Sequence, residues 1–462
     1  MGEIQKAYIV PHPPIIIPEI GKGQEKGASA TIEAYEKVGR QIKELAPEVI
    51  ILTTPHGASY GDYIHVSPEK KLRGSLKEFG APQVCFEFNS DTQLIDKIVE
   101  IAQANSIKSG GLGAAENLLD HGALIPLYYI TRFYSDFSFI RISIAGLPLD
   151  QLFLFGHCIQ QAVSQMDRKV VFIASGDLSH KLLEKGPYGY AKEGPLFDKE
   201  LIHAIKAADF KTLIGLDEAF CQQAGECGLR SFIMMGGALN GYRVNSNVLS
   251  YEGPYGVGYM VAELTPNGQD LSRDLVSFFE CKWKSEIEAT RKAEDVYVSL
   301  ARLTLETYVK KGKMIELPDY LPEDMQKVQA GVFVTIKKHG QLRGCIGTIS
   351  PVTGSIGEEI MQNAISAGTR DPRFDPVKDY ELNDLVYSVD ILNEPETVTS
   401  MDALDVTRYG VIVSSGYRRG LLLPNLEGIH TPAQQVEIAL SKAGIQANES
   451  YTMERFEVVR HR

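Results

Sequence analysis

The chain has 462 residues, of which 44% are hydrophobic and 23% are charged, a composition typical of a globular protein. A chain of this length exceeds one ordinary hydrophobic core, so we expect two or three domains. The net charge of −12 disfavours nucleic acid and anionic membrane surfaces as main partners.

The cysteines form neither a CxxC pair nor a regular framework, which favours a reducing, cytoplasmic compartment. The six are Cys85, Cys158, Cys221, Cys227, Cys281 and Cys345. No apolar run is long enough to span a bilayer, and the first residues lack the apolar core of a signal peptide. We therefore expect no membrane partner.

The first half of the chain alternates short apolar runs with amphipathic stretches. Predicted strands cover residues 7–10, 49–53, 138–144 and 170–174. Predicted helices lie between them, for example at residues 28–45 and 91–104. This alternation predicts an α/β domain, an open sheet with helices on both faces. A closing strand at 253–264 precedes a turn-rich break, so we place this domain at residues 1–265.

The second half has a different pattern. We expect a linker at residues 266–289 and a smaller α+β domain at residues 290–462. Predicted elements of that domain are a strand at 331–338, a turn-rich segment at 343–348, a helix at 356–367 and strands at 385–392 and 410–414.

Two histidines, His12 and His56, each follow a short apolar strand and stand beside a proline. In an open α/β sheet, ligands and metals collect where parallel strands end. His180 also follows a strand through a glycine turn, and His121 lies in Asp120-His121-Gly122. A lone histidine is usually structural, but the set of four predicts metal chemistry, with His12 and His56 sharing one ion.

Four short motifs resemble the class III extradiol ring-cleavage dioxygenases of the LigB type, and the Memo family that shares their fold. They are Pro11-His12-Pro13-Pro14, Thr54-Pro55-His56-Gly57, Asp120-His121-Gly122 and Gly176-Asp177-Leu178-Ser179-His180. The segment at residues 256–262 is similar to the ending of Memo-like proteins. The resemblance covers about residues 1–265, and the motifs stand in the family's order.

The resemblance to the dioxygenases implies Fe(II) on two histidines and one glutamate, with open positions for a catecholate and O₂. It makes His12 and His56 ligands, and Glu226, before the apolar helix at 229–239, is our candidate for the third. Memo-like proteins place a cysteine in this region, and Cys227 is adjacent. A Cys227 thiolate would favour Zn or Cu, whereas Glu226 keeps Fe(II) chemistry open. The alternative for Glu226 is an ordinary carboxylate at a helix start.

The same resemblance implies catalytic roles for His180 and His121. His180 would take the proton of a bound phenolic hydroxyl, and His121 would hydrogen-bond the bound oxygen or substrate. Asp177 and Asp120 are candidates to orient these imidazoles, although surface carboxylates are the commoner interpretation. The expected substrate is a small aromatic or phenolic compound.

In the second half, Leu342-Arg343-Gly344-Cys345-Ile346-Gly347-Thr348 sets a cysteine between glycines and after a cation. These neighbours favour a reactive thiolate at Cys345, whereas the alternative is a small buried thiol in a tight turn. With residues 369–374 and 418–424, this string resembles the AMMECR family over about residues 290–462. That family has an α+β fold and no settled activity. Five arginines could form an anion-binding surface around the thiol. They are Arg343, Arg370, Arg373, Arg418 and Arg419.

The two halves together resemble a fusion of the Memo-like and AMMECR-like components of the AmmeMemoRadiSam system. Its third component, a radical S-adenosylmethionine protein, is the partner that this resemblance implies. The first functional hypothesis is a metal-dependent, extradiol-dioxygenase-like oxidoreductase. The alternative is a non-enzymatic metal-binding accessory or scaffold protein of the same system.

Overall fold

The computed structural model describes residues 2–113, 118–426 and 428–462. Its contacts divide the chain into two units, Met1–Phe279 and Glu280–Arg462. The division falls within residues 266–289, where we expected a linker, and helix α10 (Leu275–Ala293) runs across it. None of the described helices is long and apolar enough to cross a membrane.

The first unit is built on a six-stranded sheet with the order β7-β2-β8-β1-β10-β9. The first four strands of that order run parallel, and β10 and β9 are antiparallel. Their bounds are β1 (Glu3–Val10), β2 (Val49–Thr54), β7 (Ser138–Ser143), β8 (Lys169–Ser175), β9 (Tyr242–Glu252) and β10 (Tyr259–Gln269).

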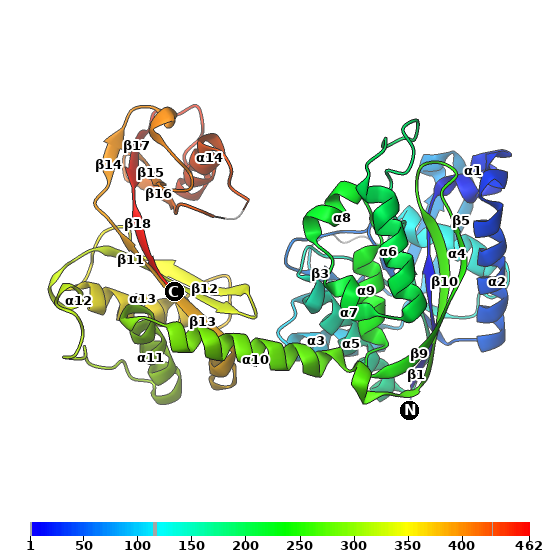
Figure 1. The fold of residues 1–462 in the computed structure, drawn as a ribbon, viewed down its shortest axis with the longest axis horizontal. Helices are drawn as coiled ribbons and strands as arrows, with labels where there is room; N and C mark the ends of the chain where they lie inside the picture. The colour runs from blue at the N-terminus through cyan, green and yellow to red at the C-terminus, as the bar shows by residue number, and fades with distance from the viewer. Residues whose placement is uncertain (1, 114–117, 427) are drawn as a thin grey trace. The chain divides into compact units, whose positions relative to one another are not determined.

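Helices cover both faces of this sheet (Figure 1). One face packs against α2 (Ser29–Leu45) and α4 (His121–Thr131), and the other against α5 (Leu149–Met166) and α9 (Leu229–Ala238). Because both faces are covered, every residue of β2 is buried. The prediction of an open α/β sheet with helices on both faces is confirmed.

Further helices and strands complete the first unit. They are α1 (Pro18–Gly21), β3 (Ile64–His65), β4 (Lys71–Leu76), β5 (Ala81–Asn89), α3 (Thr92–Ala104), β6 (Ser109–Gly110), α6 (Glu193–Ala207), α7 (Phe210–Ile214) and α8 (Glu218–Ala224). Single 3₁₀ turns lie at Pro14–Ile16, Gln24–Ala28, Lys77–Phe79 and Leu271–Arg273.

The second unit holds two antiparallel sheets, β12-β11-β13-β18 and β14-β17-β15-β16. Helices α11 and α13 pack on the first sheet and α14 on the second, which confirms the α+β fold. The strands are β11 (Gly331–Lys338), β12 (Gln341–Gly347), β13 (Leu385–Leu392), β14 (Glu396–Val398), β15 (Gly410–Ser415), β16 (Arg418–Leu422), β17 (Thr452–Phe456) and β18 (Val458–His461). The helices are α11 (Val296–Lys311), α12 (Glu323–Lys327), α13 (Ile356–Thr369) and α14 (Pro432–Ala443), with 3₁₀ turns at Asp379–Asp384 and Met401–Ala403.

Residues 343–348, expected to be rich in turns, lie mostly within β12, so that expectation is wrong. Two glycines in this segment allow close packing rather than a turn. A Cβ on Gly344 would lie 2.1 Å from the carbonyl oxygen of Ala367, and one on Gly347 would lie 2.2 Å from the ring of Phe333. Glycine inside a strand often marks such an approach.

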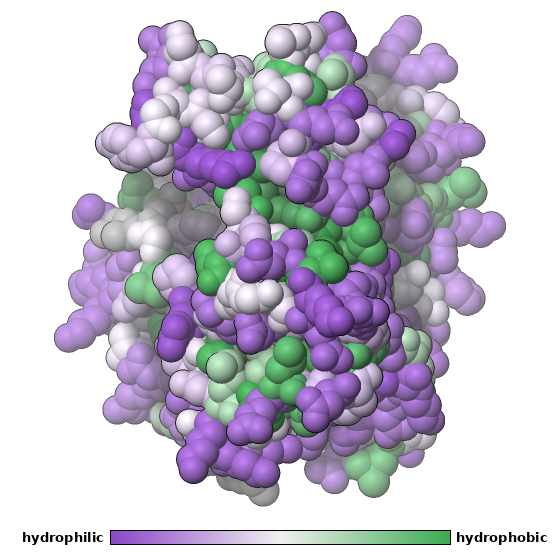
Figure 2. Space-filling model, turned by 90° about the vertical axis from the view of Figure 1, so that its left-hand side faces the viewer, coloured by the Kyte–Doolittle hydropathy of each residue, from purple (hydrophilic) through white to green (hydrophobic). Residues whose placement is uncertain are grey.

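The surface drawn in Figure 2 is mostly hydrophilic, and its apolar residues are divided into small patches. Within the described residues, this view shows no single broad apolar face of the kind that marks a large protein interface.

Strands β1, β2 and β8 end at nearly the same level of the sheet. Val10 of β1 pairs with Ser175 of β8, and Thr53 of β2 pairs with Ala174. Because these strands are parallel and in register, the residues that follow all three emerge at one edge. The register therefore brings together the loops that carry His12, His56 and residues 176–180.

Two glycines bring the loop after β8 against the loop before α9. A Cβ built on Gly176 would lie 2.2 Å from the Cα of Gly228, closer than real contacts allow. A Cβ on Gly228 would lie 2.9 Å from the carbonyl oxygen of Asp177. The approach of these backbones therefore requires a residue without a Cβ at both positions.

We predict that Gly176→Ala separates the two loops. The added methyl has no space, so the free energy of unfolding of the first unit should fall by about 1–3 kcal/mol. Urea unfolding measured by circular dichroism checks this. Gly61→Ala is the matched control, because a Cβ there meets no atom within 4 Å. Equal stability of both variants would contradict the packing argument.

Candidate metal centre

His12 follows β1, and a residue at the end of β8 fixes its tautomer. Ser175 Oγ donates its only hydrogen to the carbonyl oxygen of Gly122 at 2.6 Å. His12 Nδ1 lies 2.9 Å from the same hydroxyl oxygen, so Nδ1 carries a hydrogen and donates it. Nε2 of His12 therefore keeps its lone pair, as in metal-binding histidines whose other nitrogen donates to a neighbour.

His56 meets His12 from the loop after β2. The two Nε2 atoms lie 2.9 Å apart. Because His12 Nε2 offers a lone pair, either His56 donates an N–H to it or the two lone pairs share a cation. The loop is held by the hydroxyl of Thr54, which accepts from the His56 N–H at 3.3 Å and donates to Asp120 Oδ1 at 2.6 Å.

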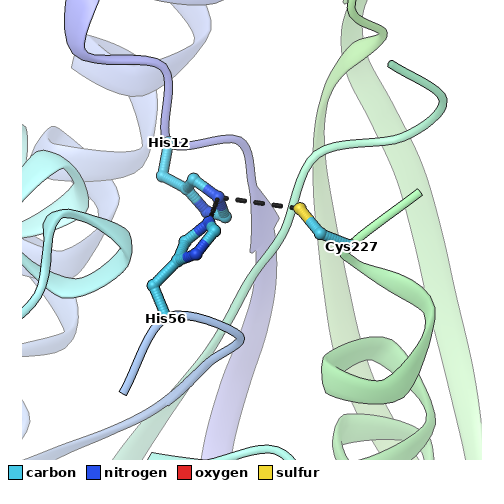
Figure 3. Close-up of side chains that lie close together, drawn as sticks. All are labelled: His12, His56 and Cys227. Carbon is cyan, nitrogen blue, oxygen red and sulfur yellow. Dashed lines mark hydrogen bonds between the residues drawn. The ribbon is translucent and has the colours of Figure 1, made fainter. Parts of the chain in front are cut away.

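Cys227 brings its sulfur to the same point from the loop before α9 (Figure 3). Its Sγ lies 3.7 Å from His12 Nε2 and accepts a hydrogen bond from the backbone N–H of Asp177 at 3.2 Å. His12, His56 and Cys227 thus place their ligand atoms within 4.8 Å of one another. Donors around a single transition-metal ion have this spacing.

Glu226, our expected third ligand, uses its carboxylate at the start of α9. Its Oε2 accepts from the backbone N–H of Leu229 at 2.7 Å. This is the helix-start role that the sequence left as the alternative. Burial raises the pKa of Glu226 to about 7. The geometry therefore favours Cys227 over Glu226 as third ligand, and the choice stays a prediction for metal binding to decide.

The two histidines expected in catalysis lie close to this group. The His121 ring stacks on that of His56 at a centroid distance of 4.1 Å, and it meets the ring of Phe79 at 5.3 Å. The His180 ring lies 5.1 Å from that of Tyr188. His180 Nε2 is buried and has no hydrogen-bond partner among the residues that the structure describes.

The two candidate orienting carboxylates have partners other than the imidazoles of His121 and His180. Asp177 Oδ1 accepts from the backbone N–H of His12 at 2.8 Å. Asp120 accepts from Thr54, and its Oδ2 lies 3.8 Å from Nη1 of the fully buried Arg141. These carboxylates therefore hold loops in place and do not bond to the rings.

Burial keeps the four imidazoles of the site neutral at pH 7. It lowers the pKa of His12 well below its ordinary value and also lowers that of His56. It lowers the pKa values of His121 and His180 to about 4. Neighbouring imidazoles lower the pKa values of three of them further, since two positive rings would repel each other. The site thus presents lone pairs that can bind a metal or accept a proton.

Sequence reasoning missed the residues that fix the loop after β8. Asp198 of α6 accepts from the backbone N–H of Ser179 at 2.8 Å and from the hydroxyl of Tyr251 at 2.7 Å. Ser175, which orients His12, was missed as well. An aspartate on the buried face of an amphipathic helix was the available signal for Asp198. Only the register of β1 against β8 identifies Ser175.

In the second unit, Cys345 lies on β12, with its sulfur 3.2 Å from Thr335 Oγ1. Burial raises the pKa of this thiol, and the lowering effect of Arg373 is smaller. Desolvation thus outweighs the nearby cation and favours the alternative of a buried thiol, and the reactivity of Cys345 stays a prediction.

Most of the arginines expected to bind anions are already paired with carboxylates. The ion pairs are Arg343–Glu381 at 2.9 Å, Arg373–Asp371 at 2.7 Å, Arg419–Glu454 at 3.0 Å and Arg418–Glu449. An anion at Cys345 would have to displace a carboxylate from Arg373, which also donates to the carbonyl oxygen of Cys345 at 3.2 Å.

Residues 6–262 match the family described as the catalytic LigB subunit of aromatic ring-opening dioxygenase, and residues 298–461 match AMMECR1. A protein of Clostridium acetobutylicum is 44% identical over 98% of both chains. One of Thermotoga maritima is 48% identical over 37% of this chain and 98% of its own.

Two solved structures are also similar to parts of the chain. That of an uncharacterized protein from Pyrococcus horikoshii has 33% identity and a TM-score of 0.34, and covers 36% of this chain and 88% of its own. That of an uncharacterized protein from Escherichia coli K12 has 13% identity and a TM-score of 0.39, and covers 56% of this chain and 99% of its own.

We predict that Cys227→Ser weakens metal binding by more than about 100-fold. Loss of a residue that only hydrogen-bonds to a metal ligand already lowers metal affinity about 10–100-fold, so loss of a ligand itself should lower it further. Glu226→Gln should keep near wild-type affinity, since its carboxylate serves the start of α9. Titration with a chromophoric chelator as competitor measures both. The reverse order would restore Glu226 as the ligand.

In the second unit, we predict an acid-sensitive ion pair at Asp371. Hydrogen bonds from the Arg373 side chain lower the pKa of Asp371 to about 2, and the hydrogen bond from the backbone N–H of Cys345 makes a smaller contribution. A depressed carboxyl pKa contributes stability that is present above about pH 4 and is lost as the pH falls through about 2. Asp371→Asn should therefore flatten the loss of stability between pH 4 and pH 2, measured by urea unfolding. Exposed Asp375, replaced by Asn, is the control and should leave the profile unchanged.

Proposed function

The chain belongs to the family of the catalytic LigB subunit of aromatic ring-opening dioxygenase, with an AMMECR1 domain in its second unit, and from this we propose that the first unit is a metal-dependent oxidoreductase. One observation carries the proposal. The Nε2 atoms of His12 and His56 and the sulfur of Cys227 converge within 4.8 Å, and a hydrogen bond leaves the His12 lone pair free.

The donor set fits a transition metal. Neutral imidazoles are ligands for iron, copper and zinc, and the backbone N–H of Asp177 donates to the sulfur, which favours the thiolate form that metals bind. Three protein ligands leave coordination positions for substrate and O₂. A redox-active metal here would supply Lewis acidity and electron exchange with O₂. We propose Fe(II), the ion that the dioxygenase resemblance implies.

The surroundings support a small phenolic substrate. His121 and His180 are neutral at pH 7, so either can accept the proton of a phenolic hydroxyl. Each lies beside an aromatic ring, Phe79 for His121 and Tyr188 for His180. Such rings favour a flat apolar ligand over a charged one.

Cys227 favours a second candidate function. A thiolate binds Cu(I) or Zn(II) more readily than a carboxylate does, so the site also suits an ion softer than the Fe(II) of the first proposal. In that case the chain would be a metal-binding accessory protein, with the AMMECR1 domain serving a partner. A radical S-adenosylmethionine protein is the partner we propose, from the resemblance of the two halves to one system.

We predict that protein purified without oxygen carries iron and consumes O₂ when a catechol is added. Metal content by mass spectrometry and O₂ uptake by electrode measure the two properties. His12→Ala should remove both while keeping the circular dichroism spectrum, because the imidazole binds and does not hold the core together. Bound copper or zinc with no O₂ uptake would support the accessory function instead. A His12→Ala variant with full metal content would show that the site is misassigned.

A further inference from the structure

We propose that this centre binds two metal ions, with the sulfur of Cys227 bridging them. His12 and His56 would complete the first site, and Asp177 and His180 the second. The inference rests on the proposed function, because it concerns the same cluster. It adds a second ion and gives Asp177 and His180 the role of ligands.

Two donor groups share one thiol. His12, His56 and Cys227 form the first group, and Asp177, His180 and Cys227 form the second. Within each group, all ligand atoms lie within 4.8 Å of one another. The sulfur is thus within reach of an ion in either group.

One ion cannot bind all five donors in this geometry. Ligand atoms at about 2.0–2.3 Å from one ion lie at most about 4.6 Å from one another. In the part of the chain that the structure describes, no set of four or five of these donors meets even the wider limit of 4.8 Å. The donors therefore separate into two sets of three, and this separation points to two ions.

Hydrogen bonds also hold the second group in place. Ser179 fixes the loop between its members, since its hydroxyl donates to the carbonyl oxygen of Ala224 at 2.7 Å and its N–H donates to Asp198 at 2.8 Å. The backbone N–H of Asp177 binds the sulfur of Cys227 at 3.2 Å. Asp177 and Cys227 thus keep their spacing before any ion arrives.

His180 and Asp177 each lack one kind of partner, a hydrogen bond for the first and a positive charge for the second, and a cation could take that place. His180 Nε2 is buried without a hydrogen bond, and Asp177 forms no ion pair with any described lysine or arginine. Asp177 is 6% exposed, so water compensates little of its charge. A buried carboxylate with no cation is costly, and a bound metal ion removes that cost.

The inference changes the roles in the proposed reaction. An imidazole that binds a metal has no free lone pair, so His180 no longer accepts a proton. His121 belongs to neither donor group, and it remains as the proton acceptor. Two-metal sites hold their ions about 3.5–4 Å apart.

Metal counting on the full chain tests the inference. Zn(II) is the probe, because it has no redox chemistry and accepts histidine, cysteine and carboxylate ligands. Metal-free protein is loaded without oxygen and desalted, and metal and protein are both measured. We expect about two ions per wild-type chain and about one for Asp177→Asn and His180→Phe. His203→Ala, an exposed histidine on α6, is the control and should keep about two.

A second measurement needs no variant, so it stands even if a substitution prevents folding. Zinc X-ray absorption of the loaded wild-type protein should show a metal–metal distance of about 3.5–4 Å. Asp177→Asn, if folded, should lose that signal and keep the sulfur contribution.

The outcomes separate the two proposals. One zinc ion per wild-type chain without a metal–metal distance would overturn the second ion and leave the proposed function standing. No bound ion would overturn both. Two ions that survive in Asp177→Asn and His180→Phe would place the second ion elsewhere and overturn the inference as well.

Discussion

The geometry of the candidate centre depends on a hydrogen bond in which none of the candidate ligand atoms takes part. Ser175 gives its hydrogen to the carbonyl oxygen of Gly122, so its hydroxyl can only accept from His12 Nδ1. This leaves the Nε2 lone pair of a ring that is 1% exposed directed at His56 and Cys227. Were Ser175 to donate to His12 instead, the hydrogen would move to Nε2 and the site would lose the lone pair of its first candidate ligand. The parallel register of β1 and β8 sets this contact.

The second constraint is the contact of two backbones at Gly176 and Gly228. It places the N–H of Asp177 on the sulfur of Cys227 and leaves the next carboxylate, that of Glu226, at the start of α9. Adjacent residues in a tight loop point in different directions, so only one of Glu226 and Cys227 can face the histidines. Which of these two side chains faces the histidines thus follows from backbone packing.

The sequence predicted the parts of this protein that depend on periodicity. Apolar runs located β1, β2 and β8, and their shared direction implied that His12 and His56 would meet. Properties that depend on orientation were not predictable in this way. The order of residues does not tell which of Glu226 and Cys227 turns inward, or that Asp177 bonds to a backbone N–H rather than to an imidazole. Cys345 shows the same limit, because the glycines beside it serve close packing of β12, and burial then outweighs its cationic neighbour.

In this arrangement, buried acidic side chains lie close together with few positively charged partners. Burial raises the pKa of Asp177 to about 7 and that of Cys227 well above its ordinary value, so ionising either in the metal-free protein is unfavourable. A metal ion bound at the proposed centre would reverse that balance, because it would bind the ionised forms and release their protons. Metal binding at that centre would therefore stabilise the first unit, by about 2.7 kcal/mol when the free metal is at 100 times its Kd. The same loops that cost stability without metal are those that metal binding would stabilise, which ties the fold of the first unit to its chemistry.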